Sequence, residues 1–189
     1  MDNDVSAGSA TSSTLGHLAL GLTLLAFGVG NTGVIDNVTA ADATGLATWV
    51  GGVALFIAGL LEFRAGNAGT GTAFSGLGAF WFTWGTGAGN EVSAEAAGLF
   101  LLLWALLALT LTAASAGSGL LGQGVYGLLF VSLLLLGIAS FAEMDGLAKA
   151  GGWAGAVAGL AAWYGATAEL AKWPTFSGRA AGRGVTATG

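Results

Sequence analysis

The chain turns back on itself within GLLEFRAGNAGTGTAFSGLGAFW, residues 59–81, where one apolar run ends and another begins. The first run stops at Glu62 and Arg64, and the turn that follows carries Gly66 and Asn67. Glycine permits the tight backbone geometry of a short connection. The pattern predicts two helices joined by a brief turn. Glu62 and Arg64 would mark a water-facing end, where Glu62 can pair with Arg64 or with another helix end.

Apolar runs of this kind fill most of the sequence. Of its 189 residues 54% are hydrophobic and 8% are charged, and the mean hydropathy is +0.78. A membrane helix needs about 20 mostly apolar residues, and backbone groups cannot stay unpaired in lipid, so each run should be helical. We predict an all-α membrane protein, a bundle of six transmembrane helices. The expected spans are 15–35, 44–63, 72–90, 96–114, 119–141 and 149–171.

Two polar tails flank the transmembrane domain, which we place at 15–173. The segment 1–14 is polar and acidic, the segment 174–189 is basic, and we expect both to be disordered. Cytoplasmic loops of membrane proteins carry an excess of Lys and Arg. If both termini are cytoplasmic, the basic residues inside are Arg64, Lys172, Arg179 and Arg183, and Lys149 alone lies outside. We therefore expect cytoplasmic termini and an inner-membrane location.

Several classes of function are disfavoured by what the chain lacks. It contains no cysteine and one histidine, His17, so we expect no enzyme with a cysteine nucleophile, no multi-histidine metal site and no cofactor. The net charge of −5 argues against a nucleic-acid partner. Away from their ends the spans carry no charged side chain, whereas ion pumps and proton relays usually keep one near mid-membrane. We assign His17 no chemistry.

Glycine is abundant, with 35 residues, and it follows helical spacing in two spans. Gly151, Gly155 and Gly159 recur every four residues in the last span, the small-xxx-small pattern that lets helix backbones approach closely. In the third span the glycines on one face are Gly71, Gly78, Gly85 and Gly89. These faces predict helix packing, either within the chain or between protomers.

The third span also carries a polar stripe at helical spacing. Its members are Thr72, Ser75, Ala79, Thr83, Thr86 and Asn90. Such a stripe can border a water-filled path, but Ser and Thr also bond to carbonyls of their own or a neighbouring helix. The bulky residues Leu77, Trp81 and Trp84 lie roughly opposite.

The opening stretch resembles the acetate and succinate permease family, the acetate transporters related to the yeast ammonia/acetate exporters. The family form of the run is AGLLE[YF]xxGNTFGxTAFxSYGxFW. The matching residues here are Glu62, Gly66, Asn67, Thr72, Ala73, Phe74, Gly78, Phe80 and Trp81. The likeness extends to LGHLALGLTLL near the start, where the family has PLGLxGFGxTT, to Asn31 with Gly33, and to the leucines around Leu133. Ser75 lies within the same run and is included among the pathway candidates.

The resemblance implies a constriction built from a Phe, a Tyr and a Leu on three helices. These positions fall on Leu20, Leu77 and Leu133, which we call the leucine neck, and the polar stripe is then assigned to helix packing. The family's Asn-Pro-x-Pro entry motif falls on Thr11 to Thr14, where both prolines are missing.

The function implied is a channel or permease for small carboxylates, acetate first and succinate second. Members of the family assemble as homohexamers with a path through each protomer, so a homo-oligomer in contact with lipid is also implied. Two alternatives stay open. One is a channel for ammonia or another small neutral solute, and the other is a membrane scaffold that transports nothing.

Overall fold

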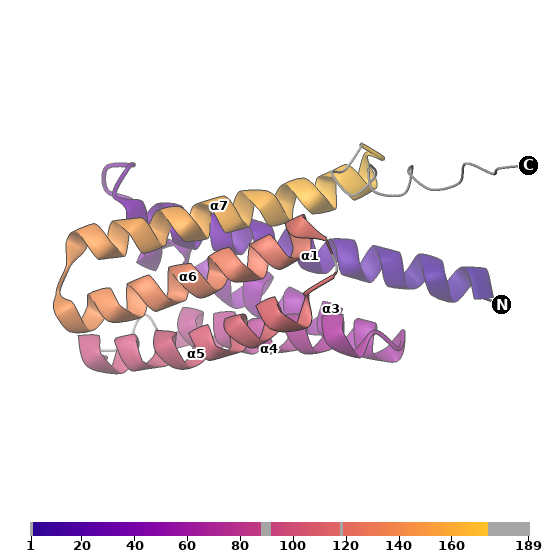
Figure 1. Cartoon of the computed structure of the whole chain (residues 1–189), viewed down its shortest axis with the longest axis horizontal. Coiled ribbons are helices and arrows are strands. Elements are labelled where there is room, and N and C mark those ends of the chain that lie inside the picture. The colour runs from indigo at the N-terminus through magenta and orange to yellow at the C-terminus, as the bar shows by residue number, and fades with distance from the viewer. Residues whose placement is uncertain (1, 88–91, 118, 174–189) are drawn as a thin grey trace, which may run out of the picture.

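The computed structural model describes residues 2–87, 92–117 and 119–173, and within them every regular element is a helix. The long helices run roughly along a common axis (Figure 1). They are α1 (Asp2–Thr32), α3 (Leu55–Arg64), α4 (Ala68–Gly87), α5 (Ala94–Ala114), α6 (Leu120–Ala142) and α7 (Asp145–Leu170). The all-helical class expected from the sequence is confirmed for these residues.

The second expected span is a composite. It starts with the 3₁₀ turn η1 (Ala40–Ala43), passes through α2 (Thr44–Leu46) and the π-helix η2 (Ala47–Ala54), and ends as α3. π-helical turns are rare and often occur at functional sites. The glycine pair Gly51 and Gly52 lies in this π-helical part and is buried.

Four of the described helical segments are long and apolar enough to cross a membrane. They are Ser12–Thr32, Ala40–Arg64, Ala94–Ala114 and Leu121–Ala142. The remaining two, α4 and α7, have 20 and 26 residues, and glycine with small polar side chains lowers their hydropathy. Large apolar side chains on the outside of the bundle fit a lipid environment, as at Leu103 and Leu106 of α5, which are 57% and 60% exposed.

The N-terminal segment differs from the expected disordered tail. Helix α1 begins at Asp2 and therefore includes residues 2–14. The run consists mainly of small polar residues and contains no proline, so no proline interrupts a helix that is already nucleated by the apolar part. The expected tail over 174–189 lies outside the described residues.

Close helix packing uses the expected glycine face of α7. A Cβ atom on Gly159 would lie 2.4 Å from the backbone nitrogen of Leu25 in α1. A Cβ on Gly155 would lie 2.8 Å from Ser132 Oγ in α6, and one on Gly151 would lie 2.9 Å from Leu136 Cγ. This face therefore packs against α1 and α6 of its own chain.

The glycines of α4 pack in the same way against the preceding segment. A Cβ on Gly78 would lie 2.8 Å from the Phe56 backbone nitrogen, and one on Gly85 would lie 2.3 Å from Thr48 Oγ1. At the turn between these segments Gly66 has φ +85°, a left-handed conformation that glycine adopts without a steric penalty. Gly89 lies outside the described residues.

Candidate functional site

Helices α1 and α4 face each other through a series of side-chain pairs. At one end the ring of His17 meets that of Phe74 edge to face, with centroids 4.9 Å apart. Further along, Phe27 meets the rings of Trp81 and Trp84 at 5.2 and 5.0 Å. Both residue numbers rise together from contact to contact, so the two helices run in the same direction. We call this series the α1–α4 ladder.

Two members of the leucine neck, Leu20 and Leu77, come after His17 and Phe74 along their helices. Leu20 and Leu77 each follow by three residues, a spacing that keeps them on the same helix faces. Both are buried, with 0% and 1% exposure, and Leu133 from α6 is 0% exposed within the same apolar core. The three residues that resemblance assigned to a constriction are therefore all interior.

Two hydrogen-bond donors lie one turn beyond this layer. Thr23 Oγ1 and Trp81 Nε1 are buried, and neither has a hydrogen-bond partner among the described residues. The π-helix η2 brings Gly51 between them, since a Cβ built there would lie 2.9 Å from both Thr23 Oγ1 and Trp81 Cγ. An unpaired buried donor costs about 1–3 kcal/mol. The ladder thus holds two donors that are buried and unused.

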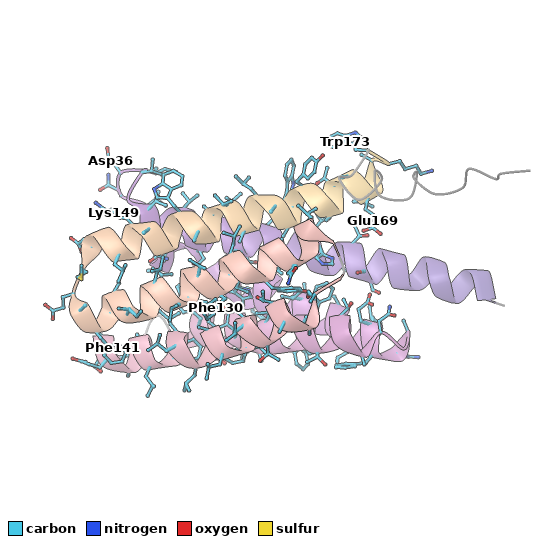
Figure 2. The ribbon with its side chains drawn as sticks, viewed as in Figure 1. Asp36, Phe130, Phe141, Lys149, Glu169 and Trp173 are labelled. Carbon is cyan, nitrogen blue, oxygen red and sulfur yellow. The ribbon has the colours of Figure 1, made fainter. Side chains whose placement is uncertain are left out.

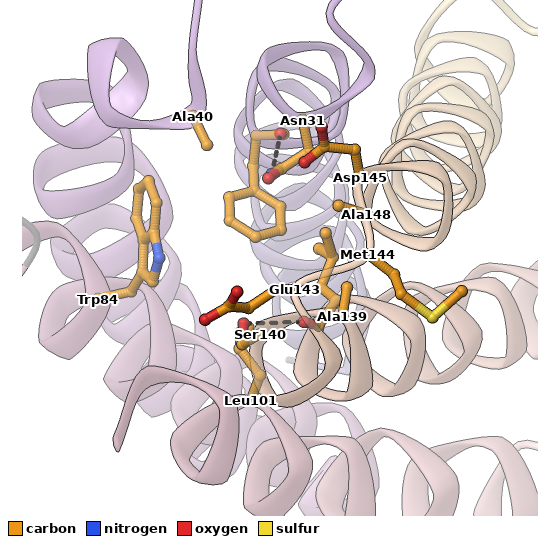
Figure 3. A pocket seen from close by; sticks show the side chains of 12 residues that line it. Asn31, Ala40, Trp84, Leu101, Ala139, Ser140, Glu143, Met144, Asp145 and Ala148 are labelled. Atoms are coloured by element: carbon orange, nitrogen blue, oxygen red, sulfur yellow. Dashed lines mark hydrogen bonds between the residues drawn. The ribbon is translucent and has the colours of Figure 1, made fainter. Parts of the chain in front are cut away.

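The ladder opens into a pocket of about 290 Å³ at the Asn31 end (Figure 3). Asn31 is held by a hydrogen bond from Nδ2 to the carbonyl oxygen of Phe27, 2.9 Å long. Trp84, Glu143 and Asp145 also line this pocket, so its rim is acidic. The family-motif residue Asn31 therefore lines this pocket.

At the opposite end Glu62 is fully buried, in contrast to the water-facing position expected from the sequence. Its carboxylate accepts hydrogen bonds from Ser12 Oγ of α1, at 2.5 Å, and from Asn67 Nδ2, at 2.8 Å. Arg64 is exposed. Ser12 and Asn67 thus stabilise the buried Glu62 carboxylate from two different segments. These hydrogen bonds connect α1 to the turn between α3 and α4.

The polar stripe of α4 points away from the ladder. The hydroxyls of Thr72, Thr83 and Thr86 are exposed and donate to the carbonyl oxygens of Ala68, Ala79 and Phe82 in their own helix. Ser75 faces the neighbouring helix α3, because its Oγ would lie 2.3 Å from a Cβ on Gly59. Asn90 lies outside the described residues. Thr72 and Ser75 are therefore not brought to the leucine neck.

Phe80 serves a packing role in the aromatic core. Its ring stacks on Phe100 of α5 with a centroid distance of 5.5 Å, and Trp104 lies at the same distance. Phe74, Phe80 and Trp81 are completely buried. Of these aromatic family-motif residues, Phe74 and Trp81 belong to the ladder, and Phe80 attaches α5 to it.

Sequence reasoning missed Ser12, Thr23 and Gly51 and gave no role to His17. Ser12 lies 50 positions from its partner Glu62. Thr23 follows Leu20 by three residues, a spacing that places both on the same face of α1. This spacing could have identified Thr23 from the sequence.

Comparisons with known proteins agree with a helical membrane protein. The model of the GPR1/FUN34/yaaH family matches residues 4–176. The chain belongs to this family.

Two curated relatives illustrate the range of the family. The succinate-acetate/proton symporter SatP of Escherichia coli is 29% identical over 162 residues, covering 81% of this chain and 84% of that protein. The glyoxylate pathway regulator of Yarrowia lipolytica is 30% identical over 157 residues, covering 76% of this chain. The match spans 57% of the Yarrowia protein's length.

A solved structure has the same architecture. It is described as the structure of the bacterial acetate channel SatP, and it matches with a TM-score of 0.78 and 27% sequence identity. The match covers 85% of this chain and 92% of that one.

Proposed function

We propose that this chain is a membrane channel or permease for small carboxylates, with acetate as the first substrate and succinate as the second. The observation that carries the proposal is the pair of unpartnered donors, Thr23 Oγ1 and Trp81 Nε1, next to the leucine neck. The names of the bacterial relative and of the solved structure support the same class of substrate.

The physical reason is the cost of removing water from an anion. A carboxylate that enters an apolar constriction loses part of its hydration shell, and this loss is expensive unless donors replace the water. The Thr23 hydroxyl and the Trp81 indole can each donate one hydrogen bond to a carboxylate oxygen. Neutral donors bind less strongly than a fixed cation, which suits rapid release.

The acidic rim of the pocket favours a second candidate, passage of ammonium or ammonia. Glu143 and Asp145 would attract a cation, and the faces of Phe27 and Trp84 can interact with it. A relative named ammonia transport outward protein 2 from Saccharomyces cerevisiae is 32% identical over 125 residues, which cover 60% of this chain.

Uptake into proteoliposomes distinguishes the candidates. Labelled acetate, succinate and methylammonium are compared with protein-free liposomes at equal lipid. We expect acetate to enter fastest and succinate more slowly, because the neck restricts size. Rapid methylammonium uptake without acetate uptake would support the second candidate, and no uptake of any of the three would support a scaffold that transports nothing.

We also propose six membrane spans with cytoplasmic termini in the inner membrane. Helix α4 is about 30 Å long at 1.5 Å per residue, enough to cross the hydrocarbon. Figure 2 places Asp36 and Lys149 at one end of the bundle and Glu169 and Trp173 at the other. Arg64 and Lys172 are exposed and belong to the second end, which supports its assignment to the cytoplasm.

Cysteine labelling checks this topology, because the chain has no cysteine of its own. Asp36→Cys and Gly69→Cys place single thiols at exposed positions near opposite ends of the bundle. A membrane-impermeant maleimide added to intact spheroplasts should label the Asp36→Cys variant at once. The Gly69→Cys variant should react after permeabilisation only. The reverse pattern, or equal labelling of both, would contradict the orientation.

The homohexamer implied by the family is likewise proposed for this chain. Exposed apolar side chains on the outer surface, such as Trp49 at 69% and Trp153 at 52%, give area for contacts between copies as well as for lipid. The glycine face of α7 is not available for such contacts, because it is covered by α1 and α6.

A further inference from the structure

The imidazole of His17 borders the leucine neck. His17 precedes Leu20 by three residues on α1, and the ring beside it, Phe74, precedes Leu77 by three residues on α4. The ring pair has little freedom, since a Cβ on the adjacent Gly16 would overlap the Phe74 ring. His17 therefore lies one helical turn from the neck, on the side of the buried Glu62.

The hydrogen bonding of the ring determines which nitrogen can titrate. His17 Nδ1 lies 2.8 Å from the carbonyl oxygen of Ser13. A carbonyl oxygen only accepts hydrogen bonds, so Nδ1 must carry the proton of the neutral ring. A second proton then binds at Nε2, which turns this nitrogen from an acceptor into a positively charged donor.

The charges around His17 create a need for such a donor. The ring is largely removed from solvent, which disfavours its charged form, and the charges of Glu169 of α7 and Glu62 of α3 offset part of this cost. Among the described residues, the basic side chains of this end are Arg64 and Lys172, and both are exposed at the surface. A substrate anion that approaches the neck here meets two negative charges while it loses water, and a partner that is positive only while protonated would offset both costs.

We propose that His17 binds the substrate carboxylate at the entrance of the leucine neck when its imidazole carries a second proton on Nε2. The inference rests on the proposed carboxylate permeation. Proton and anion then each strengthen the binding of the other, as thermodynamic linkage requires. Loss of the proton weakens the hold on the anion and permits release. The family form PLGLxGFGxTT has leucine where this chain has His17.

A single histidine makes the test direct. In protein prepared without a polyhistidine tag, His17 supplies the only imidazole signals in an NMR spectrum. Acetate added at pH 5.5 should shift these signals, whereas acetamide, which has similar shape and no charge, should not. The acetate Kd should be about tenfold weaker at pH 8.5, a difference of about 1.4 kcal/mol.

The variant His17→Gln keeps a polar side chain and removes the titratable group. Its acetate Kd, measured by calorimetry at pH 5.5, should be about tenfold weaker than that of the wild type, and it should no longer depend on pH. Leu15→Gln, at an exposed position on the same helix, is the matched control and should retain the wild-type Kd and pH dependence.

The outcomes separate this inference from the proposed function. Wild-type protein that takes up acetate into proteoliposomes, but whose His17 signals do not respond to acetate, would overturn the role of His17 alone. An unchanged Kd and pH dependence in His17→Gln would do the same. Absence of acetate uptake by the wild type would overturn the proposed function itself.

Discussion

Replacing Gly159 with alanine should severely destabilise the bundle. The added Cβ would lie 2.4 Å from the Leu25 nitrogen and 2.8 Å from the Gly21 carbonyl oxygen, both backbone atoms of α1. Backbone cannot move aside as a flexible side chain can, so α1 and α7 must separate. Overpacking of this kind costs about 1–3 kcal/mol, and we expect the upper end. The melting temperature in detergent should fall by about 5–10 °C.

Gly146→Ala is the matched control on the same helix. It has the same chemistry, and a Cβ at this position would meet nothing within 4 Å. Its melting temperature should stay close to the wild-type value, as is usual for surface substitutions. Thermal unfolding of both variants is monitored by circular dichroism. Equal melting temperatures would show that α7 does not pack tightly on α1 through this face.

Truncating a leucine side chain of the neck should have the largest effect on transport. Leu133→Ala removes three carbons from a side chain that is 0% exposed. If this side chain helps to exclude water, its removal lowers the dewetting barrier for an anion. A barrier lowered by about 1.4 kcal/mol gives about tenfold faster acetate uptake. Succinate should gain more than acetate, because the size limit relaxes as well.

The comparison must use equal amounts of folded protein, since truncating a buried leucine costs about 2–5 kcal/mol of stability. Leu103→Ala is the control, because Leu103 is 57% exposed on the outer face of α5. Labelled acetate and succinate uptake are measured for both variants. If Leu133→Ala has the wild-type rates and the wild-type preference for acetate, Leu133 does not line the path.

Much of the fold follows from hydrophobic patterning. The expected spans 96–114 and 119–141 correspond to α5 at Ala94–Ala114 and α6 at Leu120–Ala142. Long apolar runs between polar turns leave little choice of boundary in a membrane. The π-helix η2 was not predictable in this way, because one extra residue per turn hardly changes the hydrophobic pattern of a whole span.

The candidate site was predictable only in part. Family resemblance supplied Leu20, Leu77 and Leu133, and the structure places all three in the interior. The burial of Glu62 was missed because a charge beside a turn looks water-facing in sequence. Its partner Ser12 comes from a distant helix whose length was underestimated. Such contacts depend on tertiary packing, which local patterns do not contain.

We propose that small carboxylates cross this protein at the leucine neck, which α1, α4 and α6 supply. Because the chain has no cysteine, Leu77→Cys introduces a single thiol at that layer. The decisive measurement is labelled acetate uptake into proteoliposomes before and after reaction with a small methanethiosulfonate reagent. We predict that modification lowers uptake to the level of protein-free liposomes and that a reducing agent restores it. Full uptake by protein whose thiol is modified, or a thiol that the reagent cannot reach while acetate still passes, would contradict passage at this neck.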